Sequence, residues 1–175
     1  MYRRPRAVVE AERFLEQYGT TSPPVPVEEI AAWLGIQVVR APSSGSESAF
    51  LVRDGRRTII GVNSRQTRRR QRFSIAHELG HWQLHDGRPL IVDHTIRINK
   101  RDDLSSAATD IEEIEANSFA AGLLMPKNWV QASADREQLL GVVDRDQLTL
   151  SLAKEFDVST EAIRFRLINL GIFSG

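Results

Sequence analysis

Two histidines and a glutamate stand at a spacing that suits a catalytic metal centre, in the run His77-Glu78-Leu79-Gly80-His81. Residues four apart lie on the same face of a helix, so both imidazoles can reach one ion. Glu78 can then take a proton from a water that the ion makes more acidic. The pattern predicts a helix that carries the site of a hydrolase, with Zn²⁺ as its cofactor.

A hydrolytic zinc site needs a third protein ligand. One common solution adds Gly three and His six residues after the second His, but Leu84 and Gly87 occupy those positions. The other solution is a Glu from a later helix, and the acidic run at 110–117 offers three: Glu112, Glu113 and Glu115. We choose Glu113, because it shares a face with Asn117, four residues on, and with small apolar residues that suit packing beside the metal helix. Asn117 could then orient a ligand. Glu115 and Glu112 remain alternatives.

Two further histidines have open roles. His85 lies four residues after His81 and could be a ligand, a hydrogen-bond donor to the transition state, or a polar residue at the helix end. We favour the last, because the helix dipole stabilises His near a C-terminus. His94 is a candidate for oxyanion stabilisation.

Composition narrows the class of protein. Lys plus Arg (23) equals Asp plus Glu (23), so no global positive field attracts nucleic acid or a membrane. There is no cysteine, which excludes disulfides and thiolate ligands. No apolar run approaches the length of a membrane span, and the N-terminus does not resemble a secretory signal. We therefore expect a cytoplasmic protein without a membrane partner.

The remaining pattern predicts an α+β fold with a small antiparallel or mixed sheet and a C-terminal helical pair. Strands are expected at 36–39, 49–53 and 58–62, with a hairpin turn at Asp54-Gly55. Helices are expected at 7–18, 27–34, 67–84, 109–124, near Trp129, 148–156 and 159–170. Residues 86–106 are ambiguous, mostly loop with some extended structure.

Two further segments are candidates for a functional role: a run of arginines and a segment that resembles a helix-turn-helix. Five arginines form a run near the start of the metal helix: Arg65, Arg68, Arg69, Arg70 and Arg72. They could contact phosphates, but a solvated helix start with a local acidic partner is favoured. Residues 152–167 resemble a helix-turn-helix. Its acidic residues Glu155, Asp157 and Glu161 argue against a DNA face, so nucleic acid is not an expected partner.

The residues around the two histidines and in the later acidic helix resemble those of a known family. The runs Arg72-Phe73-Ser74-Ile75-Ala76-His77-Glu78-Leu79-Gly80-His81 and Glu113-Ile114-Glu115-Ala116-Asn117-Ser118-Phe119-Ala120-Ala121, with Leu123-Leu124-Met125-Pro126, are similar to the ImmA/IrrE metallopeptidases. The strand that ends in Gly61-Val62-Asn63 also fits. The resemblance extends from about Glu10 to Pro126.

The resemblance implies a gluzincin-like site, with His77, His81 and a Glu that aligns best with Glu113 as metal ligands and Glu78 as the general base. It implies a zincin-like metallopeptidase domain over residues 1–130 and a helical extension over 131–175 packed on it. Members of this bacterial or phage-borne family are typically cytoplasmic and cleave helix-turn-helix repressors of the XRE/cI-like kind. A repressor is therefore the expected protein substrate and partner. The alternative is a non-catalytic regulatory module that binds a repressor or DNA.

Overall fold

The computed structural model describes residues 5–45, 47–85, 90–94, 104–142 and 144–173, and for residues 90–94 and 104–109 it describes the backbone alone. The described residues form eleven elements, in this order: α1 (Arg6–Tyr18), α2 (Val27–Trp33), β1 (Ile36–Ala41), β2 (Glu47–Arg53), β3 (Thr58–Asn63), α3 (Arg68–Leu84), β4 (Leu90–His94), α4 (Leu104–Leu124), α5 (Lys127–Leu139), α6 (Arg145–Phe156) and α7 (Thr160–Asn169). The predicted α+β class is confirmed.

The strands form one mixed sheet in the order β1-β3-β2-β4. β1 is parallel to β3, whereas β2 is antiparallel to both β3 and β4. β2 and β3 form the predicted hairpin, where the Asp54 N–H donates to the Arg57 carbonyl and Gly55 takes a left-handed φ of 64°. Side chains alternate along β2, so that Ala49 and Leu51 are buried and Phe50 points to the other face.

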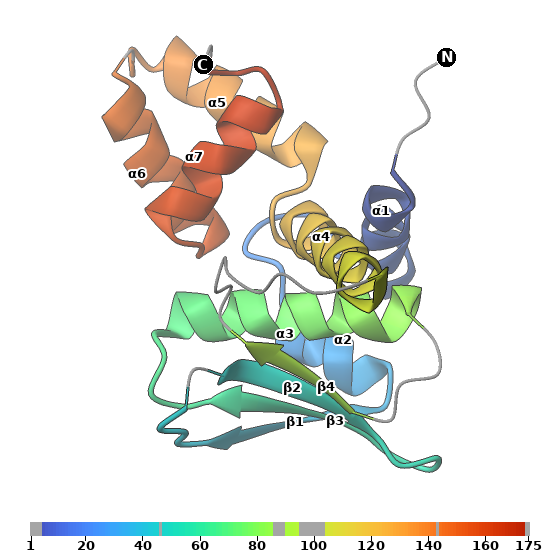
Figure 1. Ribbon diagram of the computed structural model, residues 1–175. Coiled ribbons are helices and arrows are strands. Elements are labelled where there is room, and N and C mark those ends of the chain that lie inside the picture. The colour runs from blue at the N-terminus through green and yellow to red at the C-terminus, as the bar shows by residue number, and fades with distance from the viewer. Residues whose placement is uncertain (1–4, 46, 86–89, 95–103, 143, 174–175) are drawn as a thin grey trace.

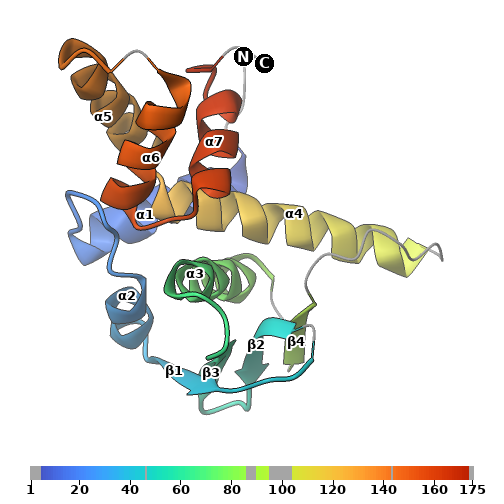
Figure 2. The same cartoon turned by 90° about the vertical axis from the view of Figure 1, so that its left-hand side faces the viewer.

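Helix α3 lies across the buried face of this sheet, in the middle of the molecule (Figure 1). α2 lies beside it, and α4 covers its far side together with α1 (Figure 2). Apolar residues of α3 such as Ile75 and Leu79 are therefore fully buried, but so are His77, Glu78 and His81. Because buried polar groups need partners, this helix must find them in its neighbours or in a ligand.

Helices α5, α6 and α7 form a further layer, on the side of α4 that faces away from the sheet (Figures 1 and 2). α6 ends at Asp157, which has a left-handed φ of 51°. α7 begins after Ser159, whose hydroxyl accepts a hydrogen bond from the Ala162 N–H. This is the predicted helical pair with its tight turn. Among the described residues, no helix combines the length and the apolar character that a bilayer crossing requires.

Three predicted helices differ from the observed ones; the smallest difference is in α6, which begins at Arg145 rather than at 148. α4 begins at Leu104 rather than near 109, because its Ser- and Ala-rich first turns carry no apolar periodicity that a sequence pattern can detect. α5 is a full helix rather than a short piece near Trp129, and it crosses the predicted domain boundary at 130 and 131. That boundary stays a prediction. The ambiguous region contains β4, while residues 86–89 and 95–103 lie outside the described residues.

Candidate metal centre

Three side chains from two helices converge at one point. The two Nε2 atoms of His77 and His81, on successive turns of α3, lie 3.0 Å apart. Glu113 of α4 places one carboxylate oxygen 3.2 Å from His77 Nε2 and the other 3.1 Å from His81 Nε2. The potential ligand atoms of this group all lie within 4.8 Å of one another. The structure thus brings together the three residues that the sequence analysis selected.

The spacing of these atoms fits a small tetrahedral cation. Two ligand atoms at about 2.0–2.1 Å from a tetrahedral zinc ion are about 3.3 Å apart. The three separations in the protein, 3.0, 3.1 and 3.2 Å, are close to that value. Two imidazole nitrogens and a carboxylate also form the ligand set of hydrolytic zinc sites. The group could therefore hold a metal ion without rearrangement of the helices.

Close packing of α3 against α4 makes this convergence possible. A Cβ atom added to Gly80 would lie only 3.1 Å from the Cα and the carbonyl oxygen of Ala116 and from the Cβ of Phe119. A glycine on one helix opposite an alanine on the other lets the two backbones approach closely. Glu113, one turn before Ala116, is thereby brought within reach of both histidines.

The pKa shifts of His81 and Glu113 favour the protonation states that bind a metal. Burial lowers the pKa of His81 below its ordinary value. Burial raises the pKa of Glu113, but hydrogen bonds with His77 and His81 outweigh this effect and hold that pKa well below its ordinary value. A neutral imidazole and an ionised carboxylate are the forms that coordinate a cation.

The outer nitrogens of both histidines are also held. Nδ1 of His77 lies 3.1 Å from Oδ1 of Asn117, and donates to it. Nδ1 of His81 lies 3.0 Å from Nδ1 of His85, and Nε2 of His85 lies 3.0 Å from Oε2 of Glu115. Glu115, the rival third ligand, is thus directed at His85 and not at the two candidate ligands on α3.

The other sequence candidates lie elsewhere. The side chain of His94, at the end of β4, lies outside what the structure describes. Glu112 is not part of the His77, His81 and Glu113 group. Glu78 follows His77 on α3 and is 0% exposed, so its carboxylate is removed from bulk water beside the candidate ligands.

Arg53, which the sequence analysis did not select, caps the C-terminal end of α3. Its guanidinium, at the end of β2, donates to the carbonyl oxygens of His81, Trp82 and His85 at 3.1, 2.9 and 2.9 Å. The end of a helix leaves carbonyls short of donors, and Arg53 supplies donors here, although the His81 carbonyl also accepts from the His85 N–H. The only sequence signal was a cation at the end of a strand, and such a residue is usually solvated.

The arginine run has an acidic partner, as expected, but it is not simply solvated. Asp157, in the turn between α6 and α7, lies 3.3 to 3.5 Å from Arg68, Arg69 and Arg72. Arg72 is only 7% exposed and also donates to the carbonyl oxygen of Val25 at 2.9 Å. The run therefore attaches the C-terminal helices to α3.

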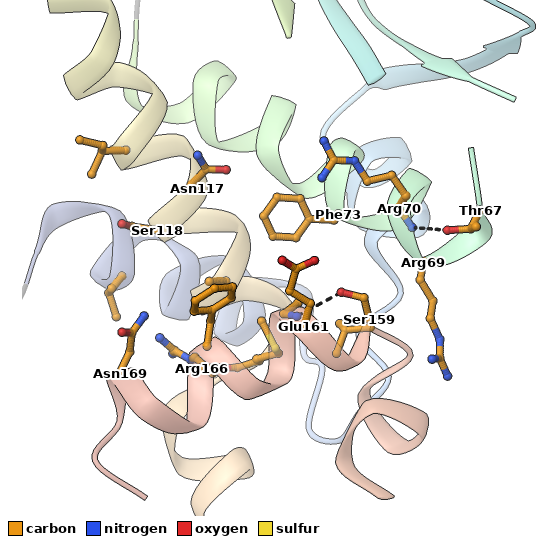
Figure 3. Close-up of a pocket in the computed structure, with 17 residues that line it drawn as sticks. Thr67, Arg69, Arg70, Phe73, Asn117, Ser118, Ser159, Glu161, Arg166 and Asn169 are labelled. Carbon is orange, nitrogen blue, oxygen red and sulfur yellow. Dashed lines mark hydrogen bonds between the residues drawn. The ribbon is translucent and has the colours of Figure 1, made fainter. Parts of the chain in front are cut away.

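A cavity of about 670 Å³ lies between α3, α4 and α7 (Figure 3); its lining includes the His77 partner Asn117 but none of His77, Glu78, His81 and Glu113. Phe73, one turn before His77, also lines it. Residues of α7 and its cap line it from Ser159 to Asn169. Figure 3 shows the carboxylate of Glu161 directed from α7 towards Phe73. Exposed Ile114 and Phe165 add apolar surface to its lining.

Comparisons with known proteins agree with this geometry. The chain is 30% identical over 132 residues to "Uncharacterized immunity region protein 2" of Bacillus phage phi105, an alignment that covers 73% of this chain and 74% of the phage protein. A solved Mycobacterium tuberculosis transcriptional regulator superposes with a TM-score of 0.57 at 20% identity, over 93% of this chain and 46% of that one. The chain thus spans a little under half of the regulator, and the likeness concerns the fold alone. The model of the IrrE N-terminal-like domain, peptidase family M78, matches residues 31–168. Since this match covers most of the sequence, the chain belongs to the IrrE N-terminal-like peptidase family.

Proposed function

We propose that this protein is a zinc-dependent endopeptidase that hydrolyses a peptide bond in a helix-turn-helix transcriptional repressor of the XRE/cI-like kind. The observation that carries the proposal is the convergence of His77, His81 and Glu113 with a buried Glu78 beside them. The proposal includes a metallopeptidase domain over residues 1–130 and a helical extension over 131–175. It also includes a cytoplasmic location, where a repressor would be met.

His77, His81 and Glu113 would hold the ion, for which Zn²⁺ is the best match to two imidazoles and one carboxylate. When bound, such an ion makes a water more acidic and polarises a carbonyl group. Glu78 would accept the proton of the attacking water and pass it to the leaving amine. Its complete burial supports this role, because a charge acts more strongly where bulk water is excluded.

The cavity between α3, α4 and α7 is compatible with a polypeptide substrate. Both apolar and polar side chains line it, which suits a peptide segment with side chains of either kind. The names of two similar proteins, an immunity region protein of a phage and a transcriptional regulator, support a repressor-related role. They do not describe cleavage, so the choice of a repressor as substrate is part of the proposal.

DNA binding by the C-terminal helices is a weaker alternative. In helix-turn-helix proteins the first residues of the second helix contact the bases. Here Ser159 and Glu161, at the start of α7, line the cavity against α3. Asp157, in the turn, pairs with three arginines of α3. The ion pairs of Asp157 support a packing role for the turn, and the negative charge of the exposed Glu161 opposes contact with DNA.

Glu78→Gln separates the enzyme from a non-catalytic module. The variant keeps all three candidate ligands, so we expect one zinc ion per chain, as in the wild type, by elemental analysis. Cleavage of candidate repressors, beginning with any encoded beside the gene, should fall about 10²–10⁴-fold because the general base is lost. Mass spectrometry of the products gives the cleaved bond. Wild-type cleavage rates in Glu78→Gln would refute the catalytic role, and absence of zinc from the wild type would refute the metal centre.

A further inference from the structure

His85 and Glu115 extend the candidate centre outward through His81. Nδ1 of His81 lies 3.0 Å from Nδ1 of His85, whose Nε2 lies 3.0 Å from Oε2 of Glu115. The rings of His81 and His85 have centroids 5.1 Å apart, one helical turn from each other. His81 and His85 are 1% and 8% exposed, so bulk water does not compete for these contacts.

The direction of these hydrogen bonds follows from the ligand role of His81. Nε2 of His81 faces Glu113 and His77, so it is the atom that would bind the metal, and with the metal bound it would carry no proton. The neutral ring then carries its proton on Nδ1 and donates to His85. Nδ1 of His85 must accept, which leaves the His85 proton on Nε2, where it donates to the Glu115 carboxylate. Each of the two rings thus has one tautomer that fits its partners.

The backbone holds the same chain of residues in place. Arg53 donates to the carbonyl oxygens of both His81 and His85, so the last turn of α3 is fixed from the side of the sheet. Glu115 and Glu113 lie two residues apart on α4 and reach successive histidines of α3. A single helix therefore supplies both a candidate ligand and the carboxylate that orients another ligand through His85.

We propose that His85 and Glu115 are positioning residues, which fix the proton and the ring orientation of His81 for metal binding and are not themselves ligands. This proposal rests on the metal centre of the proposed function. The sequence alone had left several possible roles for His85 and had kept Glu115 as an alternative ligand. Carboxylate–histidine partners of this kind raise the basicity of a metal ligand and restrict its ring.

The test measures zinc affinity by competition with a chromophoric chelator, using the full chain. His85→Phe keeps a planar ring of similar size but removes both hydrogen bonds, and should weaken zinc binding about 10–100-fold. Glu115→Ala should weaken it less, because His85 remains. His85→Asn places an amide oxygen near the position of Nδ1, so it should restore affinity to within about threefold of the wild type. Asp110→Ala, an exposed carboxylate on the same helix, is the control and should have no effect.

Two further measurements separate a positioning role from a loss of structure. Thermal unfolding of the metal-free variants should remain close to that of the wild type. The visible spectrum of the Co²⁺-substituted protein should change in His85→Phe, since it reports the geometry around the ion. The double variant His85→Phe with Glu115→Ala should bind zinc as weakly as His85→Phe alone, because both act through one chain of hydrogen bonds.

The outcomes distinguish this proposal from the proposed function. Wild-type zinc affinity and an unchanged Co²⁺ spectrum in His85→Phe would overturn the positioning role while leaving the metal centre intact. Independent, multiplicative losses from the two single changes would also overturn it. If the wild type binds zinc and the variants lose affinity as expected, the positioning role stands even where the wild type cleaves no repressor.

Discussion

The two halves of α3 bury polar side chains in different ways. In the first half, Arg72 is closed off by partners of the protein itself, the Asp157 carboxylate and the carbonyl oxygens of Asp157 and Val25. In the second half, His77 and His81 direct their Nε2 atoms at each other and at Glu113. The first arrangement neutralises a charge, whereas the second gathers electron-pair donors around one point.

This difference shows what to look for in a candidate site. Burial and pKa shifts occur in both halves: burial lowers the pKa of Arg72 against the opposing effect of Asp157, and burial lowers the pKa of His81. Neither feature alone separates a structural ion pair from a metal centre. Convergence of several candidate ligand atoms at the spacing of a coordination shell occurs in the second half alone of the two. We therefore expect substitutions in the second half of α3 to weaken zinc binding, and substitutions in the first half to leave it unchanged.

The largest expected effect is the response of stability to zinc. Zinc at about 100 to 1,000 times its Kd should raise the free energy of unfolding by about 2.7–4.1 kcal/mol, because it binds the folded state. His81→Ala removes a candidate ligand and should abolish this increment. Arg72→Met should retain it in full, although the variant starts from a lower stability. Chemical denaturation with and without zinc measures both. If both variants lost the increment equally, the assignment of zinc binding to the second half of α3 would be contradicted.

A smaller effect is expected from the ion pairs at the first half. Arg72→Met leaves the Val25 carbonyl without its donor and Asp157 without its most buried partner, and should destabilise the protein by about 1–3 kcal/mol. Arg68→Met removes an arginine whose side chain is 82% exposed and which contacts the same carboxylate. An exposed pair contributes at most about 1 kcal/mol, so this matched control should change little. Equal losses in the two variants, measured by urea unfolding, would contradict the role of burial.

The same contrast separates what the sequence could predict from what it could not. The i, i+4 spacing predicted that His77 and His81 share a face, and the spacing of Glu113 and Asn117 predicted the face of α4 that meets them. Both are local periodicities, so they can be read along the chain. The fold class, the hairpin and the C-terminal helical pair also follow from local patterns, and the structure confirms them.

Contacts between distant segments could not be predicted in this way. Arg72 and Asp157 are 85 positions apart, and no periodicity connects them. The sequence offered Glu115 only as an alternative ligand, and no local pattern predicted that its carboxylate would pair with His85 of another helix. The capping of α3 by Arg53 depends on how the helix lies on the sheet. These partners are set by tertiary packing, which a single sequence does not display.

The smallest expected effect is a pH dependence that belongs to the second half alone. The pKa of His81 is lowered in the folded protein, so near and below the ordinary value of about 6.5 the unfolded chain binds the proton more readily. The stability of the metal-free protein should therefore fall as the pH decreases from about 7 to 5, by at most about 1.4 kcal/mol per pH unit for this one proton. The pKa of Glu113 is also lowered, and its stabilising effect is lost only in more acidic solution, below the ordinary carboxyl range.

Urea unfolding of the metal-free protein across this pH range measures the slope. His81→Gln should show a shallower slope than the wild type, because the buried group that resists protonation is gone. Arg72→Met should keep the wild-type slope, since a guanidinium does not titrate in this range. A slope that changed with Arg72 and not with His81 would mean that the second half does not hold its histidine in the neutral form that a metal needs. The assignment of the metal centre to that half would then lose its electrostatic basis.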